Sequence, residues 1–358
     1  MSSAVESPRI TARRSQAIAS LGLLSLLVAT CLVTDLLARN RALEHWFMVK
    51  SSEFAEKNGV LFSNTGNFID FEERVLLDEI PRADYAHGGV YFFGTSNIKW
   101  AFNTLDLSAE RKRWIGNYGI GASSHTTALN LIHYLIEQHG FLTAGDRDVV
   151  IIGASFHLAR DDGPDGYFGS LLSRHGLFTA AAGGRMVPAQ KSTVERWLVI
   201  EKARSGGFIW NLGRLAKNWA KASSGRAPPP RHNGERYRQA WRGYMGPNWQ
   251  QNMDAEVEGL RKSIDLVRSH HAQIKVVLLP QGTWTDELPF KTRYEAQVRT
   301  LCQATSTPLI DLSRAMPDED FVDSNHLTVK GQEKFRDLIM GAISGHLLSL
   351  ERSNAAPR

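Results

Sequence analysis

The stretch VYFFGTSN, residues 90–97, decides the fold that this sequence predicts. Its apolar first half is typical of a strand that is covered on both faces. Gly94 then allows a tight turn, which presents Ser96 at the carboxyl end of that strand. Further strands and helices are expected to alternate along the chain, which indicates an α/β fold with a mostly parallel sheet and helices on both faces.

The apolar patterns give approximate bounds for these elements. Continuous apolar runs predict strands at residues 89–93, 115–118, 148–152, 274–279 and 308–311. Helical spacing predicts helices at residues 123–139, 254–269, 294–305 and 328–348. Residues 158–250 interrupt the alternation with glycine pairs, a proline run and five tryptophans, so we expect one insertion there, part helix and part loop.

The chain divides into five predicted parts. These are a cytoplasmic N-terminus at 1–14, a transmembrane anchor at 15–38, a connecting region at 39–87, a catalytic domain at 88–348 and a tail at 349–358. The anchor is predicted because residues 15–34 carry no charge and are long enough to span a bilayer core. Arginines precede this stretch, so the positive-inside bias favours a single-pass inner-membrane protein whose domain is periplasmic. A cleaved signal peptide and a lipoprotein signal at Cys31 are the alternatives.

Composition narrows the possible classes. With 42% hydrophobic and 22% charged residues, the chain is that of a globular protein. Its net charge of +5 permits anionic partners such as phospholipid headgroups or acidic polysaccharide. The basic residues are scattered and no nucleic-acid-binding motif is present, so we expect no nucleic-acid partner. Cys31 falls inside the apolar stretch, so a disulfide to Cys302 is not expected.

One segment of the insertion is basic and amphipathic. In residues 208–221 (FIWNLGRLAKNWAK) the apolar side chains share one helical face and most cations lie elsewhere. Such a helix can lie on a bilayer surface or pack on the domain with a solvated basic face, and both readings stay open.

A second segment, FVDSNHLT at residues 321–328, completes the chemistry that Ser96 begins. A serine hydroxyl needs a base to take its proton, and His326 can serve as that base. Asp323, three residues earlier, can receive the other ring N–H and fix the tautomer. The developing oxyanion needs donors, which the Ser96 backbone N–H and the glycine-rich residues 117–121 can offer.

The order of these blocks resembles the SGNH/GDSL hydrolase superfamily. That family carries a Gly-Asp-Ser block after the first strand, an oxyanion glycine after the second, an asparagine after the third and Asp-x-x-His before the last helix. The matching blocks here are residues 94–96, 117–121, 153–155 and 323–326. The resemblance spans about residues 88–345 without the insertion and implies a flavodoxin-like α/β fold and a set of site residues. The implied catalytic residues are Ser96, His326 and Asp323, and the implied oxyanion or substrate residues are Gly121, Gly119, Asn117, Ser155 and Asn97.

Two departures from the family pattern point to one branch of it. Thr95 replaces the family's aspartate, and Ser155 stands near where the asparagine is expected. These features resemble the membrane-anchored branch that acylates envelope polymers, which includes DltD-type D-alanyl transfer proteins and periplasmic polysaccharide O-acetyltransferases. The resemblance implies a serine acyltransferase or esterase that acts on acetyl or D-alanyl groups of an envelope polysaccharide. It also implies a membrane-bound O-acyltransferase as partner, and no cofactor.

Other readings of the same residues remain. The two departures also fit a non-catalytic binding or scaffold subunit of a polysaccharide-modification complex. His125 and His157 follow the second and third strands and border the predicted pocket, although a structural role is favoured for both. A metal site is not expected, because no H-x-x-x-H or H-E-x-x-H spacing occurs. A nucleotide site at residues 94–96 lacks both glycine-rich phosphate motifs.

Overall fold

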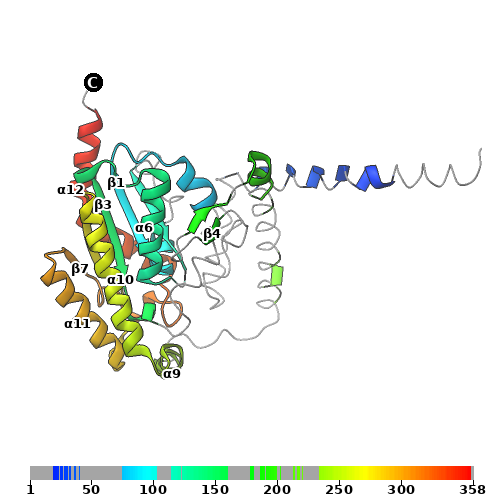
Figure 1. Cartoon of the computed structure of the whole chain (residues 1–358). Helices are drawn as coiled ribbons and strands as arrows, with labels where there is room; N and C mark the ends of the chain where they lie inside the picture. The colour runs from blue at the N-terminus through cyan, green and yellow to red at the C-terminus, as the bar shows by residue number, and fades with distance from the viewer. Residues whose placement is uncertain are drawn as a thin grey trace, which may run out of the picture.

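A five-stranded parallel sheet forms the centre of the protein (Figure 1). The computed structural model describes residues 75–102, 114–121, 123–159, 178–180, 186–189, 191–199 and 234–355, with scattered positions at 19–40 and 202–220. The strands are β1 (Gly89–Gly94), β2 (Ile115–Gly119), β3 (Asp148–Ala154), β6 (Gln273–Leu278) and β7 (Leu309–Asp311). Every neighbouring pair is parallel and the order is β2-β1-β3-β6-β7, the flavodoxin-like order. The predicted α/β fold is therefore confirmed.

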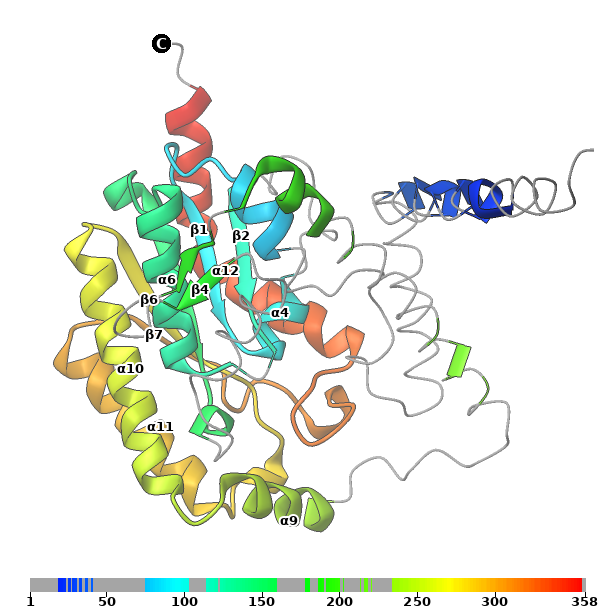
Figure 2. The ribbon, with the colours of Figure 1, turned by 45° about the vertical axis from the view of Figure 1, so that its right-hand side comes forward.

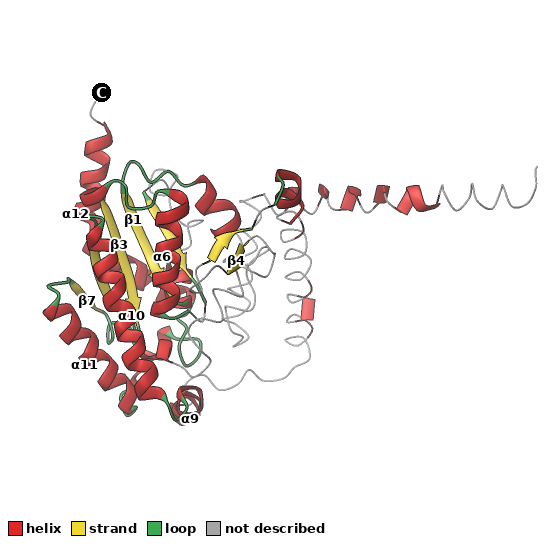
Figure 3. Ribbon diagram, in the orientation of Figure 1, coloured by secondary structure: helices red, strands yellow, loops and turns green. Residues whose placement is uncertain are grey.

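Helices cover both faces of the sheet, as the sequence predicts (Figures 1 and 3). One face carries α6 (His125–His139), α10 (Trp249–Ser269) and α11 (Pro289–Ala304). The opposite face carries α4 (Ser96–Ala101) and α12 (Val329–Ala355), which contact each other (Figure 2). Because side chains alternate along a strand, β1 sends Phe93 into the first layer and Phe92 into the second. Each ring is fully buried and contributes about 1.5–3 kcal/mol of transfer free energy.

The observed helix ends differ in part from those that the apolar spacing predicts. α6 begins where the Ser124 hydroxyl accepts a hydrogen bond from the Thr127 N–H, and it ends at Gly140 with a φ of 64°. α10 and α11 each begin five residues before the predicted start. The extra first turn of α11 starts with Pro289, whose fixed φ suits the first helical position. These added turns carry mostly polar residues, so periodicity of apolar side chains does not detect them.

The insertion contains more regular structure than we predicted. Strands β4 (Phe178–Ala180) and β5 (Met186–Pro188) pair antiparallel, whereas the sequence indicated only helix and loop. Helix α9 (Gly234–Met245) closes the insertion and buries Trp241. Trp197, by contrast, is 55% exposed. The amphipathic segment 208–221 lies almost entirely outside the described residues.

The predicted membrane anchor is only partly described. The positions described between residues 19 and 37 are helical, and they expose seven large apolar side chains: Leu21, Leu23, Leu26, Val28, Leu32, Val33 and Leu36. No helix built from described residues is both long and apolar enough to cross a bilayer. The rest of segment 15–38 lies outside the described residues, so the anchor stays a prediction.

The described end of the connecting region packs on the domain. A π-helical turn, Val75–Glu79, is followed by a 3₁₀ turn, Ile80–Arg82, and both contribute to the core. The Tyr85 hydroxyl lies 2.7 Å from the hydroxyl of Tyr118 on β2. These contacts tie residues 75–85 to the same face of the sheet as α6.

Helix α4 sits directly on the backbone of β2, and Gly119 makes this possible. A Cβ on Gly119 would lie 2.7 Å from the Cα of Lys99 and closer still to its nitrogen. We expect Gly119→Ala to lower the unfolding free energy by about 1–3 kcal/mol, because overpacking against backbone forces α4 off the strand. Urea denaturation measures the change.

Gly341→Ala is the matched control for this substitution. Gly341 lies within α12, and a Cβ there would meet nothing within 4 Å. This change should raise stability by about 0.5–1 kcal/mol through helix propensity. Equal effects from the two alanines would contradict the close approach at Gly119.

His125 is a buried structural histidine at the start of α6. Its Nε2 lies 2.6 Å from the Tyr294 hydroxyl on α11, and its backbone N–H donates to Glu256 on α10. Burial lowers the pKa of His125 to about 3 from an ordinary value of 6.5. The ring is therefore neutral in the folded protein and ties three helices together, which agrees with the structural role that the sequence favoured.

This low pKa predicts acid sensitivity. Between the unfolded value of 6.5 and the folded value of about 3, the unfolded chain binds a proton that the folded chain does not. Wild-type stability should therefore fall on acidification by about 1.4 kcal/mol per pH unit more than that of His125→Gln. Urea midpoints at a series of pH values measure both slopes. His133→Gln, at an exposed position on α6, should keep the wild-type slope.

Candidate active site

Ser96 is the first residue of α4, at the point where β1 ends. Gly94 makes the turn with a φ of 147°, which side-chain-bearing residues rarely adopt. Thr95 is the N-cap, and its hydroxyl accepts a hydrogen bond from the Asn97 N–H at 3.4 Å. Thr95, the first departure from the family pattern, therefore has a local role in starting the helix that carries Ser96.

Residues 321–327 form a narrow loop ahead of α12. Phe321 and Leu327 pair as an isolated antiparallel bridge, and the Val322 N–H donates to the His326 carbonyl at 2.8 Å. Inside the loop the Asp323 carboxylate accepts from the backbone N–H groups of Asn325 and His326, at 2.8 and 2.7 Å. The loop is therefore folded around the carboxylate, which fixes the direction of the Asp323 side chain.

The two segments meet, and their three predicted catalytic side chains are in contact. Ser96 Oγ lies 2.9 Å from His326 Nε2. His326 Nδ1 lies 2.9 and 3.1 Å from the two oxygens of Asp323. With an ionised Asp323, Nδ1 carries the hydrogen and donates it, so Nε2 is the acceptor that faces the serine. This is the tautomer in which a histidine can take the proton of a serine hydroxyl.

The Asp323 carboxylate is held in its charged form. Burial alone raises the pKa of this group, but hydrogen bonds from the His326 ring, the His326 backbone and the Asn325 backbone outweigh it. The pKa of Asp323 therefore lies below its ordinary value. An ionised carboxylate beside the ring stabilises an imidazolium, the form that His326 takes during proton transfer.

The block after β2 supports α4 with its side chains. The Asn117 amide donates to the backbone carbonyls of Lys99 and Phe102 at 2.8 and 2.6 Å. Its amide oxygen accepts the Gly119 N–H at 3.1 Å. Asn117 thus holds the end of α4, and the Gly119 N–H is directed at Asn117. These bonds give both residues structural partners, and the oxyanion or substrate role that we predicted for them stays a prediction.

Gly121 and Asn97 keep positions that suit the predicted role. Gly121 is a half-buried turn residue just after Ile120, whose N–H donates to the Gly94 carbonyl at 2.8 Å. The Gly121 backbone is therefore at the same sheet edge as Ser96. Asn97 is buried beside Ser96, and its Nδ2 has no hydrogen-bond partner among the described residues. A buried amide donor without an acceptor is costly unless something else binds it.

Ser155 follows β3 and belongs to a second polar group. Its hydroxyl accepts from Gln281 Nε2 at 2.8 Å and lies 2.6 Å from His157 Nδ1. The Ser155 hydroxyl therefore has two buried side-chain partners, Gln281 and His157. The sequence placed Ser155 near the oxyanion, whereas its hydroxyl is committed to these two buried partners. His157 likewise has a structural partner, as the sequence favoured.

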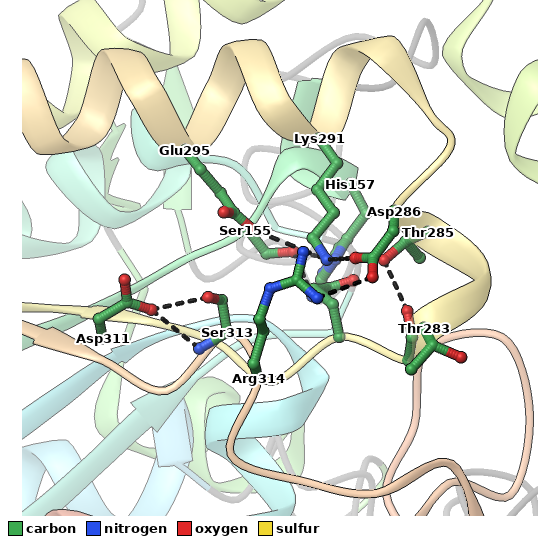
Figure 4. Close-up of polar contacts among 12 residues, drawn as sticks. Ser155, His157, Thr283, Thr285, Asp286, Lys291, Glu295, Asp311, Ser313 and Arg314 are labelled. Atoms are coloured by element: carbon green, nitrogen blue, oxygen red, sulfur yellow. Dashed lines mark hydrogen bonds and ion pairs between the residues drawn. The ribbon is translucent and has the colours of Figure 1, made fainter.

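Ion pairs lie next to this second group (Figure 4). Lys291 on α11 is buried and lies 2.5 Å from Asp286 and 4.0 Å from Glu295. Arg314 adds a contact to Asp286 at 2.8 Å. Burial alone raises the pKa of Asp286, but its bonds to Lys291 and Arg314 hold it below the ordinary value. The cluster fixes the chain between β6 and α11.

Several residues at this edge were missed from the sequence. Gln281, Trp241 and Trp284 touch the blocks described above, although no motif includes them. For Gln281 a signal existed, since it follows the end of β6 at the edge where parallel strands place their sites. Across the described parts of the chain, no three His, Cys, Asp or Glu side chains converge as a metal ion would need.

Comparison with known proteins does not assign this chain to a family. No protein-family model and no curated protein matches the chain. Among solved structures, a GDSL-like lipase from Bacteroides thetaiotaomicron is similar at 11% identity, with 78% of this chain and 99% of that chain covered and a TM-score of 0.39. A Bacteroides fragilis protein with a provisional description as an acylhydrolase has 13% identity, 77% and 95% coverage and a TM-score of 0.39. A carbohydrate acetylesterase from Sinorhizobium meliloti has 11% identity, 72% and 99% coverage and a TM-score of 0.29. At such values the likenesses carry no argument about family or function.

Proposed function

We propose that this chain is a serine acyltransferase or esterase of SGNH type, in which Ser96 is the nucleophile. The observation that supports this most directly is the unbroken contact from Ser96 Oγ through His326 to Asp323, at 2.9 Å for each of the two steps. Ser96 and His326 are 230 residues apart, so their meeting is a product of the fold. Such a hydroxyl–imidazole–carboxylate series is what acyl transfer through a serine requires.

The chemical steps follow from the tautomer. Ser96 Oγ attacks the acyl carbonyl as its proton passes to His326 Nε2, and Asp323 stabilises the resulting imidazolium. The tetrahedral intermediate collapses when His326 returns that proton to the leaving oxygen or nitrogen, which leaves an acyl ester on Ser96. His326 then takes a proton from water or from a glycan hydroxyl, and attack by that oxygen releases the acyl group and regenerates the serine.

The oxyanion is assigned to backbone donors at the edge of the sheet. The Ser96 N–H belongs to the first turn of α4, where helical N–H groups have no partner within the helix. The Gly121 backbone and the Asn97 amide are the further candidates, given their positions beside this turn. Since Ser155 is committed to Gln281 and His157, we leave it out of the oxyanion group.

The substrate and setting remain part of the proposal. The uncharged segment 15–34 and the exposed apolar side chains of its helical positions support an inner-membrane anchor. The domain would then work in the periplasm on acetyl or D-alanyl groups of an envelope polysaccharide, beside a membrane-bound O-acyltransferase. A basic net charge of +5 suits an anionic polymer or a membrane surface.

Ser96→Ala should abolish covalent labelling by a fluorophosphonate probe and reduce hydrolysis of p-nitrophenyl acetate by roughly 10³-fold or more. The alanine removes the attacking oxygen and leaves the Thr95 cap in place, so the melting temperature should change little. Mass spectrometry of the labelled peptide in wild type locates the adduct, and it should fall on Ser96.

Ser155→Ala is the matched control, because Ser155 also contacts a histidine. It should still be labelled at Ser96. Labelling that persists in Ser96→Ala, or that maps to Ser155, would overturn the assignment of the nucleophile. A wild-type protein that binds polysaccharide but never reacts with the probe would favour the non-catalytic scaffold reading instead.

Asp323→Asn should lower kcat by about 10³–10⁴-fold with little change in KM, because a neutral amide no longer holds the ring in the required tautomer or stabilises the imidazolium. It should also destabilise the fold at neutral pH. Since the folded pKa of Asp323 is depressed, this stability difference should shrink as the pH falls below the unfolded value of 3.8.

Steady-state kinetics and urea midpoints between neutral pH and pH 2 provide both readouts. Asp337→Asn makes the same chemical change at an exposed position of α12 and should leave activity and stability as in wild type. An unchanged kcat in Asp323→Asn would remove the carboxylate from the mechanism.

A further inference from the structure

Two tryptophans from distant parts of the chain point at one backbone oxygen of the His326 loop. The Ser324 carbonyl accepts the indole N–H of Trp241 at 3.3 Å and the indole N–H of Trp284 at 3.3 Å. Trp241 belongs to the insertion helix α9, and Trp284 belongs to a 3₁₀ turn, Thr283–Thr285. Each ring is only 4% exposed, so both donors act away from bulk water.

Residues outside the loop bind it at two backbone carbonyls: Gln332 on α12 donates to the Leu327 carbonyl at its end, and the two indoles donate to the Ser324 carbonyl at its middle. The bonds within the loop run between Val322 and His326 and from Asp323 to the backbone of Asn325 and His326. These bonds set the shape of the loop, but they do not fix how the loop as a whole is turned relative to α4. A carbonyl oxygen has two lone pairs, so two donors from different directions can fix that orientation.

Contacts with two buried rings fix the position of the Trp241 side chain. Its ring packs edge-on against Phe156 at a centroid distance of 5.3 Å and lies tilted against the His157 ring at 5.8 Å. His157 is held in turn by Ser155, which accepts from Gln281. The contacts among Gln281, Ser155 and His157 therefore support the Trp241 ring, which in turn binds the loop that carries His326. In Figure 1, α9 lies at the end of the molecule to which the arrow of β3 points, which is the edge that carries the site.

A different set of contacts fixes the position of the Trp284 side chain. The Thr283 N–H and hydroxyl donate to the two oxygens of Asp318, at 2.8 and 2.5 Å. After the turn, Asp286 is held by Lys291 and Arg314 (Figure 4). Gly282 makes room for the ring, since a Cβ there would overlap the Trp284 side chain. The ring also packs on Phe321, the residue at the start of the loop, at a centroid distance of 5.3 Å.

We infer that Trp241 and Trp284 are positioning residues that orient the Asp323–His326 loop toward Ser96 by holding the Ser324 carbonyl between them. This inference rests on the proposed function, because it assigns the two indoles a role through His326. It also gives the insertion a part in catalysis, since α9 supplies one of the two donors. Proton transfer depends steeply on geometry, so a loop that turns by a small angle loses the 2.9 Å contact to Ser96.

The test is a double-mutant cycle with Trp241→Phe and Trp284→Phe in the full-length chain. Phenylalanine keeps an aromatic ring in each pocket and removes only the N–H donor and one ring. Because the remaining indole still holds the carbonyl, each single variant should lose no more than about threefold in kcat. The double variant should lose roughly 30-fold, more than the product of the singles, with KM unchanged.

The rate of fluorophosphonate labelling at Ser96 is the second readout. It should fall in the same pattern, because it depends on the His326–Ser96 contact and not on substrate binding. Trp249→Phe is the matched control, since that ring lies at the start of α10 and packs on Phe290 and Arg293 of α11. It should leave kcat and the labelling rate as in wild type.

The Trp→Phe double variant can fail to fold because each substitution removes a ring. 3-Benzothienylalanine avoids this, because it keeps the shape of the indole and carries sulfur in place of the N–H. Introduced at positions 241 and 284 together, it should give the same loss of kcat. Wild-type activity in the doubly substituted protein would overturn the inference. So would single Trp→Phe variants whose losses of kcat multiply to the loss in the double variant. In either case, labelling of Ser96 would still support the proposed enzyme. Absence of labelling in wild type would instead overturn the proposed function.

Discussion

The contact between Ser96 and His326 is the interaction on which the functional interpretation of this protein depends. Parallel strands bring their carboxyl ends to one edge of a sheet, so residues that follow different strands meet there. Ser96 follows β1 directly, whereas His326 reaches the same edge from the loop that precedes α12. Packing of α12 against α4 then joins the two segments, and Gly119 lets α4 lie close enough to the sheet for that packing.

Much of this arrangement is predictable because its signals are local. The buried strand and glycine turn before Ser96, and the spacing of three between Asp323 and His326, are patterns that a single stretch of sequence contains. The alternation of apolar runs with helical spacing predicts the parallel sheet, and the strand order follows the flavodoxin-like rule. What these patterns share is that each requires no knowledge of which distant residues will be neighbours.

The parts that the sequence did not predict are those that depend on such neighbours. Asn117 looks like a substrate residue in an Asn-x-Gly block, but its amide is used by the carbonyls of Lys99 and Phe102. Trp241 reaches Ser324 across 83 residues, and nothing in its own surroundings indicates that contact. The strands β4 and β5 have three residues each, too few for a period of two to be recognised.

Two serine–histidine contacts lie at this edge, and their surroundings distinguish them. Ser155 and His157 are only 3% and 5% exposed, and the Ser155 hydroxyl accepts from Gln281 and contacts the His157 ring. An acyl group could reach the Ser155 oxygen only if the hydrogen bonds to Gln281 and His157 were broken. His326 and Asp323 keep about a fifth of their side-chain surface exposed, and the histidine faces Ser96 with its acceptor nitrogen. The Ser155–His157 pair therefore supports the architecture and the Trp241 ring, whereas the Ser96–His326 contact, with Ser96 9% exposed, is the more accessible of the two.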